Sequence, residues 1–149
     1  MDINREAPVI GAGEIQIAAT PATVWGVLSD VDGWPRWNSD VKSAHMEGPV
    51  AVGSTFRWKS GPASLTSTLQ AVEPPTEIGW TGTTMTIKAV HVFHLEPRDG
   101  GTFVRSEESW EGSIASMLKG YSRKSIDSAI TSILAALKRE AERQAGAAT

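Results

Sequence analysis

The side chains best suited to chemistry are one histidine and one glutamate on consecutive predicted strands, His91 and Glu108. A turn at 97–101 joins these strands, and counting outward from it makes the two residues diagonal neighbours. Imidazole and carboxyl groups are common general acids and bases, and Tyr121 supplies a third group able to carry a proton. The pair could equally be a hydrogen-bonded contact that stabilises the sheet, because burying either group alone costs roughly 1–3 kcal/mol. Both interpretations stay open.

Strand alternation predicts where these side chains point. On the first strand of the hairpin, Lys88 and His94 share a face suited to water, so His91 and Phe93 are predicted to point inward. The same argument applies to the other strands and to the start of the last helix, and together they predict the wall of a pocket. The residues predicted to bind a ligand there are Phe56, Trp58, Leu69, Trp80, His91, Phe93, Ser106, Glu108, Trp110, Met117 and Tyr121.

The aromatic composition indicates what such a pocket would hold. The chain has six tryptophans against one tyrosine and three phenylalanines. Trp offers a large apolar surface with one N–H donor, so a cluster of them fills a core or lines a ligand site. An apolar wall with a few polar groups suits a small molecule with a flat hydrophobic body. We therefore predict a hydrophobic or aromatic small molecule as the partner.

Other kinds of site find little support in the sequence. There is no cysteine, and His91 and His94 would face opposite sides of one strand, so no metal site is predicted. No nucleophile elbow and no phosphate-binding glycine loop is present, and no cofactor is expected. The 149 residues carry a net charge of −3 without a basic run, which argues against nucleic-acid binding.

Composition also sets expectations about location and assembly. No apolar run reaches the roughly 20 residues of a membrane helix, so stable membrane insertion is not expected. The first residues lack a basic stretch followed by an apolar one, and a cytoplasmic protein is the simplest interpretation. A monomer or a weak homodimer is expected.

The elements that must position these residues form one predicted domain over 1–149, with its core at about 14–143. Residues 1–12 are expected to be a loose arm. A helix begins at Thr20-Pro21, where Thr caps and Pro fits the first turn, and a helical corner follows at 34–38. Strands are predicted at 14–18, 41–46, 54–59, 64–73, 76–81, 85–96 and 101–111. From Gly112 to about residue 143 the apolar residues recur at helical spacing, which predicts a long helix. Gly120 is a candidate point of interruption in it.

The architecture follows from burial. A long amphipathic helix must cover its apolar stripe, and the apolar face of a seven-stranded sheet is the available partner. Short turns between consecutive strands predict an antiparallel meander. The long strands can curve around the helix, and a gap is expected near the N-terminal half of that helix.

Four segments carry a resemblance to a known superfamily. They are ATPATVWGVLSDVDGWPRWNSDV, VEPPTEIGW, HVFHLEPRDGGTFV and EESWEG, in this order along the chain. The chain resembles the START/polyketide cyclase–dehydrase-like superfamily (SRPBCC), which includes the birch-pollen-allergen-like proteins. The resemblance implies an α+β helix-grip fold: a curved seven-stranded antiparallel sheet around a long C-terminal helix, with two short helices between strands one and two. It also implies a hydrophobic cavity, but no single reaction.

Three functions remain open at this point. The first is binding of a hydrophobic or aromatic molecule in a cavity between the sheet and the C-terminal helix. The second is an enzyme of the polyketide cyclase, aromatase or dehydratase type, in which His91, Glu108 or Tyr121 would move protons. The third is a co-chaperone-like interaction module, which would expose an apolar patch away from the pocket.

Overall fold

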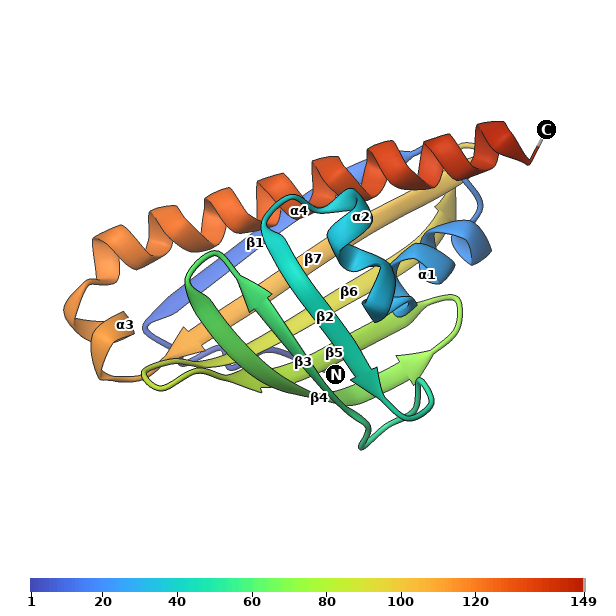
Figure 1. The fold of residues 1–149 in the computed structure, drawn as a ribbon. Coiled ribbons are helices and arrows are strands. Elements are labelled where there is room, and N and C mark those ends of the chain that lie inside the picture. The colour runs from blue at the N-terminus through green and yellow to red at the C-terminus, as the bar shows by residue number, and fades with distance from the viewer. Residues whose placement is uncertain (149) are drawn as a thin grey trace.

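A long helix lies across one face of a seven-stranded antiparallel sheet in the computed structural model, which describes residues 1–148 (Figure 1). Consecutive strands from β2 to β7 pair with each other, and β1 pairs with β7, giving the order β1-β7-β6-β5-β4-β3-β2. The strands are β1 (Val9–Ile17), β2 (Val41–Glu47), β3 (Thr55–Ser60), β4 (Ala63–Glu73), β5 (Glu77–Thr83), β6 (Lys88–Arg98) and β7 (Gly101–Glu111). The predicted meander is confirmed.

Helical segments follow β1 and β7. They are α1 (Pro21–Ser29), η1 (Val31–Gly33) and α2 (Trp34–Trp37), and then α3 (Ser113–Met117) and α4 (Lys119–Ala147). Thr20 caps α1 as predicted, because its hydroxyl accepts a hydrogen bond from the Thr23 amide at 3.2 Å. No helix within residues 1–148 is long and apolar enough to cross a membrane.

Helix α4 docks mainly on β1, and glycines make the contact close. Ile130 and Leu134 on the buried stripe of α4 lie directly over Gly13. A Cβ atom at Gly13 would lie 2.8 Å from Ile130 Cγ2 and 3.0 Å from Leu134 Cδ1, so the helix can approach this closely only over a bare backbone. The helix-grip α+β fold is therefore confirmed together with the position of its helix.

The element boundaries that differ most from the prediction lie near the two ends of the chain. Strand β1 begins at Val9 rather than at 14, and it pairs with β7 from Thr102 to Trp110. The alternation of its first half was hidden because Gly11 and Gly13 carry no side chain. The C-terminal helix is interrupted at Leu118 rather than at Gly120, and α4 continues to Ala147 rather than ending near 143.

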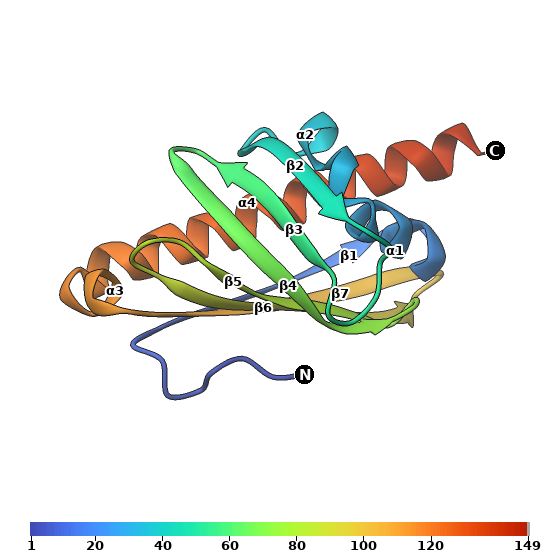
Figure 2. The ribbon, with the colours of Figure 1, turned by 60° about the horizontal axis from the view of Figure 1, so that its bottom comes forward.

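The N-terminal arm is not loose, and that prediction was wrong. It runs along the face of the sheet opposite α4 (Figure 2). Ile3 is buried there against Val90 and Val92, which share the outer face of β6 with Lys88 and His94. The arm explains their burial, because it covers the outer face of β6 with an apolar side chain.

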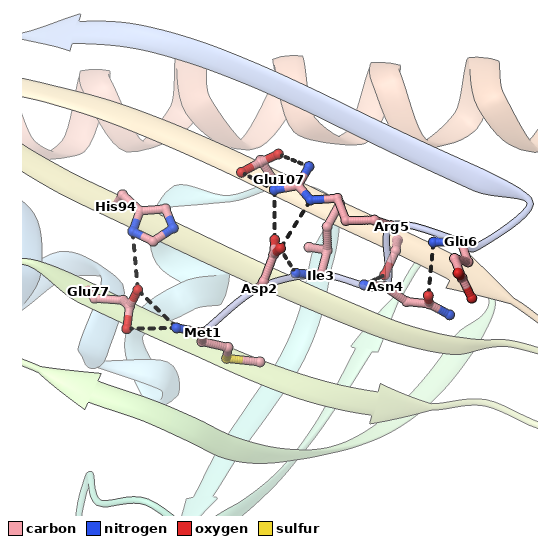
Figure 3. Close-up of polar contacts among 10 residues, drawn as sticks. Met1, Asp2, Ile3, Asn4, Arg5, Glu6, Glu77, His94 and Glu107 are labelled. Carbon is pink, nitrogen blue, oxygen red and sulfur yellow. Dashed lines mark hydrogen bonds and ion pairs between the residues drawn. The ribbon is translucent and has the colours of Figure 1, made fainter.

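Polar contacts also hold the arm (Figure 3). The Arg5 guanidinium lies 2.6 Å from the Glu107 carboxylate, and the pKa of that carboxyl is lowered by the hydrogen bonds from Arg5. The backbone N–H of Asn4 donates to the Ser109 hydroxyl at 3.1 Å. On the same face His94 Nδ1 lies 3.2 Å from a Glu77 oxygen. His94 therefore belongs to the outer face, as alternation predicted.

Candidate functional site

A cavity of about 470 Å³ lies between the inner face of the sheet and the first half of α4. Strands β2 to β7 contribute to its wall, together with α2, α3 and the turns that join them. The apolar part of the wall consists of Trp34, Val41, Trp58, Pro62, Ala63, Leu65, Trp80, Ile87, Ala89, Trp110, Ile114, Leu118, Ala129 and Ile133. The volume falls within the range of roughly 300–1,000 Å³ usual for small-molecule sites.

Aromatic rings form one side of the cavity. The Trp34 ring centre lies 5.5 Å from that of Trp58 in an edge-to-face arrangement and 5.4 Å from that of Trp80. The Trp80 ring also lies 5.2 Å from the His91 ring. The other two ring pairs are tilted, at 42° and 56°, so the four rings form a continuous packed aromatic surface.

The deep polar group of the cavity is the pair predicted from the sequence. His91 and Glu108 are paired directly across β6 and β7, rather than diagonally as predicted. Their side chains are 7% and 13% exposed, and His91 Nδ1 lies 3.6 Å from Glu108 Oε1. The other ring nitrogen, Nε2, lies 2.7 Å from the Ser106 hydroxyl. Both nitrogens of His91 therefore face polar groups.

Burial sets the protonation of this pair. It lowers the pKa of His91 to about 3, so the imidazole is neutral at pH 7. Burial also raises the pKa of Glu108 to about 7, with a partly opposing hydrogen bond from the Trp110 side chain. The 3.6 Å contact is therefore no ion pair near neutral pH, but a contact between a neutral ring and a carboxyl that titrates there.

Ser106, His91 and Glu108 are connected in the order of a hydrolytic triad, but the serine hydroxyl is not accessible to a substrate. Ser106 is fully buried and does not belong to the cavity wall. A nucleophile must reach the substrate, whereas this hydroxyl can only hold the imidazole in place. The 2.7 Å contact with the Ser106 hydroxyl fixes the orientation of the His91 ring.

The structure divides the predicted pocket residues into three groups. Those at the cavity wall are Trp58, Trp80, His91, Glu108, Trp110 and Tyr121. Those on the same face of the sheet but fully buried in the core beside the cavity are Phe56, Leu69, Phe93 and Ser106. Met117 is 77% exposed and lies away from the wall, because the break at Leu118 separates α3 from α4 and leaves this side chain in solvent.

Tyr121 marks the mouth of the cavity. It is 72% exposed although it contributes to the wall, and Leu118 beside it is also exposed. This exposed edge of the cavity lies between α3, the start of α4 and the β5–β6 turn. Met85, at the tip of that turn, is fully exposed as well.

Sequence reasoning missed several wall residues. Trp34 was assigned to a corner, yet it is buried and lines the cavity. Its indole N–H donates to the Leu28 carbonyl at 3.1 Å, which holds the corner over the sheet. Asp40 and Asn38, just after that corner, also line the cavity. Nothing in the local sequence distinguishes a corner that folds over a sheet from one that faces solvent.

Comparison with known protein families shows to which family the sequence is similar. The sequence model of the family described as "Polyketide cyclase / dehydrase and lipid transport" matches residues 11–142. That span includes all seven strands except the first two residues of β1, and most of α4. No curated protein matches the chain.

Solved structures with the same fold cover almost the whole chain. A hypothetical protein from Helicobacter pylori has a TM-score of 0.83 at 14% identity, covering 92% of this chain and 90% of its own. The protein Ara h 8.0201 has a TM-score of 0.73 at 15% identity, covering 89% and 96%. A START superfamily protein from Mycobacterium smegmatis has a TM-score of 0.66 at 16% identity, covering 94% and 99%. At these identities the likeness establishes the fold.

Proposed function

The chain belongs to the polyketide cyclase/dehydrase and lipid transport family, and we propose that it binds a hydrophobic or aromatic small molecule in the cavity between the sheet and α4. The observation that carries this proposal is the cavity itself. About 470 Å³ of space is lined mainly by apolar side chains, with tryptophans on one side and the buried pair His91 and Glu108. Such a wall favours a ligand with a flat apolar body, because burying apolar area on both partners drives association.

An enzyme acting in the same cavity is the second candidate. The observation that favours it is the pair His91 and Glu108, whose pKa values burial moves to about 3 and about 7. Neighbouring groups whose pKa values are moved apart are typical of acid–base sites, and a carboxyl with a pKa near 7 suits a general acid. A cyclase, aromatase or dehydratase reaction would use Glu108 to transfer a proton to or from the bound molecule.

The interaction module is the least supported candidate. This function predicts an exposed apolar patch away from the pocket. The most exposed large apolar side chains, Met85, Met117 and Tyr121, belong to the segments around the cavity mouth, and the β2–β3 turn away from the cavity exposes the smaller pair Val50 and Val52. Apolar groups at the cavity mouth serve ligand entry at least as well as protein docking.

Binding can be tested with an uncharged naphthalene ketone fluorophore such as prodan. We expect its emission to shift to the blue, the tryptophan emission to be quenched and the protein to be stabilised. At a concentration one hundred times the dissociation constant, stabilisation should be about 2.7 kcal/mol. Titration fluorescence and thermal unfolding with and without prodan measure these effects.

A matched pair of variants locates the binding. Ala89→Leu adds bulk at the cavity wall and should weaken binding roughly tenfold, or about 1.4 kcal/mol. Ala22→Leu makes the same change on the exposed face of α1, outside the cavity wall, and should leave the affinity unchanged. Absence of binding, or equal affinity for both variants, would count against the cavity as the site. Native mass spectrometry of freshly purified protein would identify a ligand that co-purifies.

A further inference from the structure

The charges at the cavity wall restrict which molecules can enter. The titratable side chains there are Asp40, His91, Glu108 and Tyr121, and within residues 1–148 no lysine or arginine belongs to the wall. A ligand carboxylate buried in the cavity would find no cation among these wall side chains. Buried charges are tolerated only when they are paired, so such a ligand is disfavoured.

The Glu108 carboxyl accepts a hydrogen bond from the Trp110 side chain, which leaves the O–H of its protonated form to be satisfied. His91 uses one ring nitrogen for Ser106 at 2.7 Å, and its other nitrogen lies 3.6 Å from Glu108, beyond normal hydrogen-bond distance. When protonated, the carboxyl has one O–H donor. Glu108 belongs to the cavity wall, so a ligand acceptor can reach it.

We propose that the cavity selects an uncharged ligand that presents a hydrogen-bond acceptor, such as a ketone oxygen, to the Glu108 carboxyl, and that it discriminates against carboxylates. This inference rests on the proposed function and names its ligand class. Neutral His91 leaves Glu108 without a cationic partner, and burial raises the pKa of Glu108 to about 7, so the donor form predominates below that pH. A cationic ligand is also disfavoured there, because the deepest acidic group is then uncharged.

Ligands that share one ring system separate these possibilities. 2-Acetylnaphthalene carries the ketone, 2-ethylnaphthalene lacks an acceptor, 2-naphthoate carries a carboxylate and 2-naphthylmethylammonium carries a cation. At pH 6, calorimetric titration should rank the ketone first. Its advantage over the hydrocarbon should be roughly three- to tenfold, the usual size of one hydrogen bond. The carboxylate should bind at least roughly tenfold more weakly than the ketone.

Variants of Glu108 test the contact itself. Glu108→Leu should abolish the preference for the ketone over the hydrocarbon, because it removes the donor. Glu108→Gln keeps an N–H donor and should retain the preference. Glu96→Gln makes the same chemical change on an exposed part of β6 and should behave as the wild type. Circular dichroism checks that each variant is folded.

The pH dependence adds a second readout. Between pH 6 and pH 8.5 the wild type should lose most of its ketone preference, whereas Glu108→Gln should keep it. Gly11 of β1 is paired with Glu108. Helix α4 places the titratable side chain of Asp127 close to Gly11, so Asp127 must be tested as well as the wall residues. Asp127→Asn should leave the pH profile unchanged, because that carboxyl is exposed and does not belong to the cavity wall.

The outcomes distinguish this inference from the proposed function. If the hydrocarbon binds as tightly as the ketone, or if the carboxylate or the ammonium binds more tightly than both, the inference is overturned while binding in the cavity stands. If Glu108→Leu keeps the ketone preference, the contact is assigned to the wrong residue and the inference fails. If none of the four compounds binds, the proposed function fails and the inference falls with it.

Discussion

Leu134→Ala is expected to lower the free energy of unfolding by about 2–5 kcal/mol, as large-to-small changes in packed cores do. Leu134 is 3% exposed and lies on the buried stripe of α4. It packs over Gly13 of β1, where no side chain can fill the space that Leu134 would leave. The lost contacts would therefore remain as a cavity, which places the expected loss well above that of a surface change. Urea unfolding followed by circular dichroism measures it.

The nearby Thr131 gives the control. It is exposed on α4, so Thr131→Ala should change the free energy of unfolding by less than about 0.5 kcal/mol. A loss below about 0.5 kcal/mol for Leu134→Ala as well would mean that α4 does not dock on β1. The cavity would then lose one of its walls.

Glu108→Gln is expected to become more stable relative to the wild type as the pH rises. The pKa of Glu108 is about 7 in the folded protein against 4.5 for the free side chain. A raised pKa means that the folded state binds the proton more tightly than the unfolded state. The corresponding stability is fully present below pH 4.5 and is lost as the pH rises through 7. The glutamine variant does not titrate, so it avoids this loss.

The expected size follows from the shift. This rise in the pKa of Glu108 corresponds to about 3 kcal/mol. Between pH 4.5 and pH 8, the free energy of unfolding of Glu108→Gln should increase by about that amount relative to the wild type. Urea unfolding of both proteins at several pH values measures the difference. The pKa of His91 is lowered rather than raised. Because His91 is present in both proteins, its contribution cancels in the comparison. Glu96→Gln should show no such trend, and a flat difference for Glu108→Gln would contradict the burial of an uncompensated carboxyl.

Strand periodicity made the inner face of the sheet predictable. His91 and Phe93 lie on it, and His94 lies outside, because β6 and β7 pair without a bulge. The turn at Asp99-Gly100 made the pairing of β6 with β7 nearly predictable. His91 and Glu108 were expected to be diagonal neighbours, and they are directly paired. Local patterns are sufficient when a strand is regular and one face is apolar.

Long-range packing was the part that the sequence could not reveal. Trp34 reaches the cavity only because the corner after α1 folds over the sheet, and no local period encodes that. Ile3 covers Val90 and Val92, although the segment that carries Ile3 shows no hydrophobic periodicity. Met117 points into solvent because of one break in the helix at Leu118. Each depends on segments that lie far apart in the sequence or on a local break that no pattern announces.

The most direct test of the cavity as a ligand site uses the tryptophan side chains as reporters. In a ¹⁵N–¹H spectrum each indole N–H gives one signal, and variants with single Trp→Phe changes assign them. Four tryptophans line the cavity, namely Trp34, Trp58, Trp80 and Trp110, whereas Trp25 and Trp37 do not. Titration with 2-acetylnaphthalene should shift the signals of the four and leave those of Trp25 and Trp37 in place. No shift at all, or shifts confined to Trp25 and Trp37, would contradict binding in this cavity.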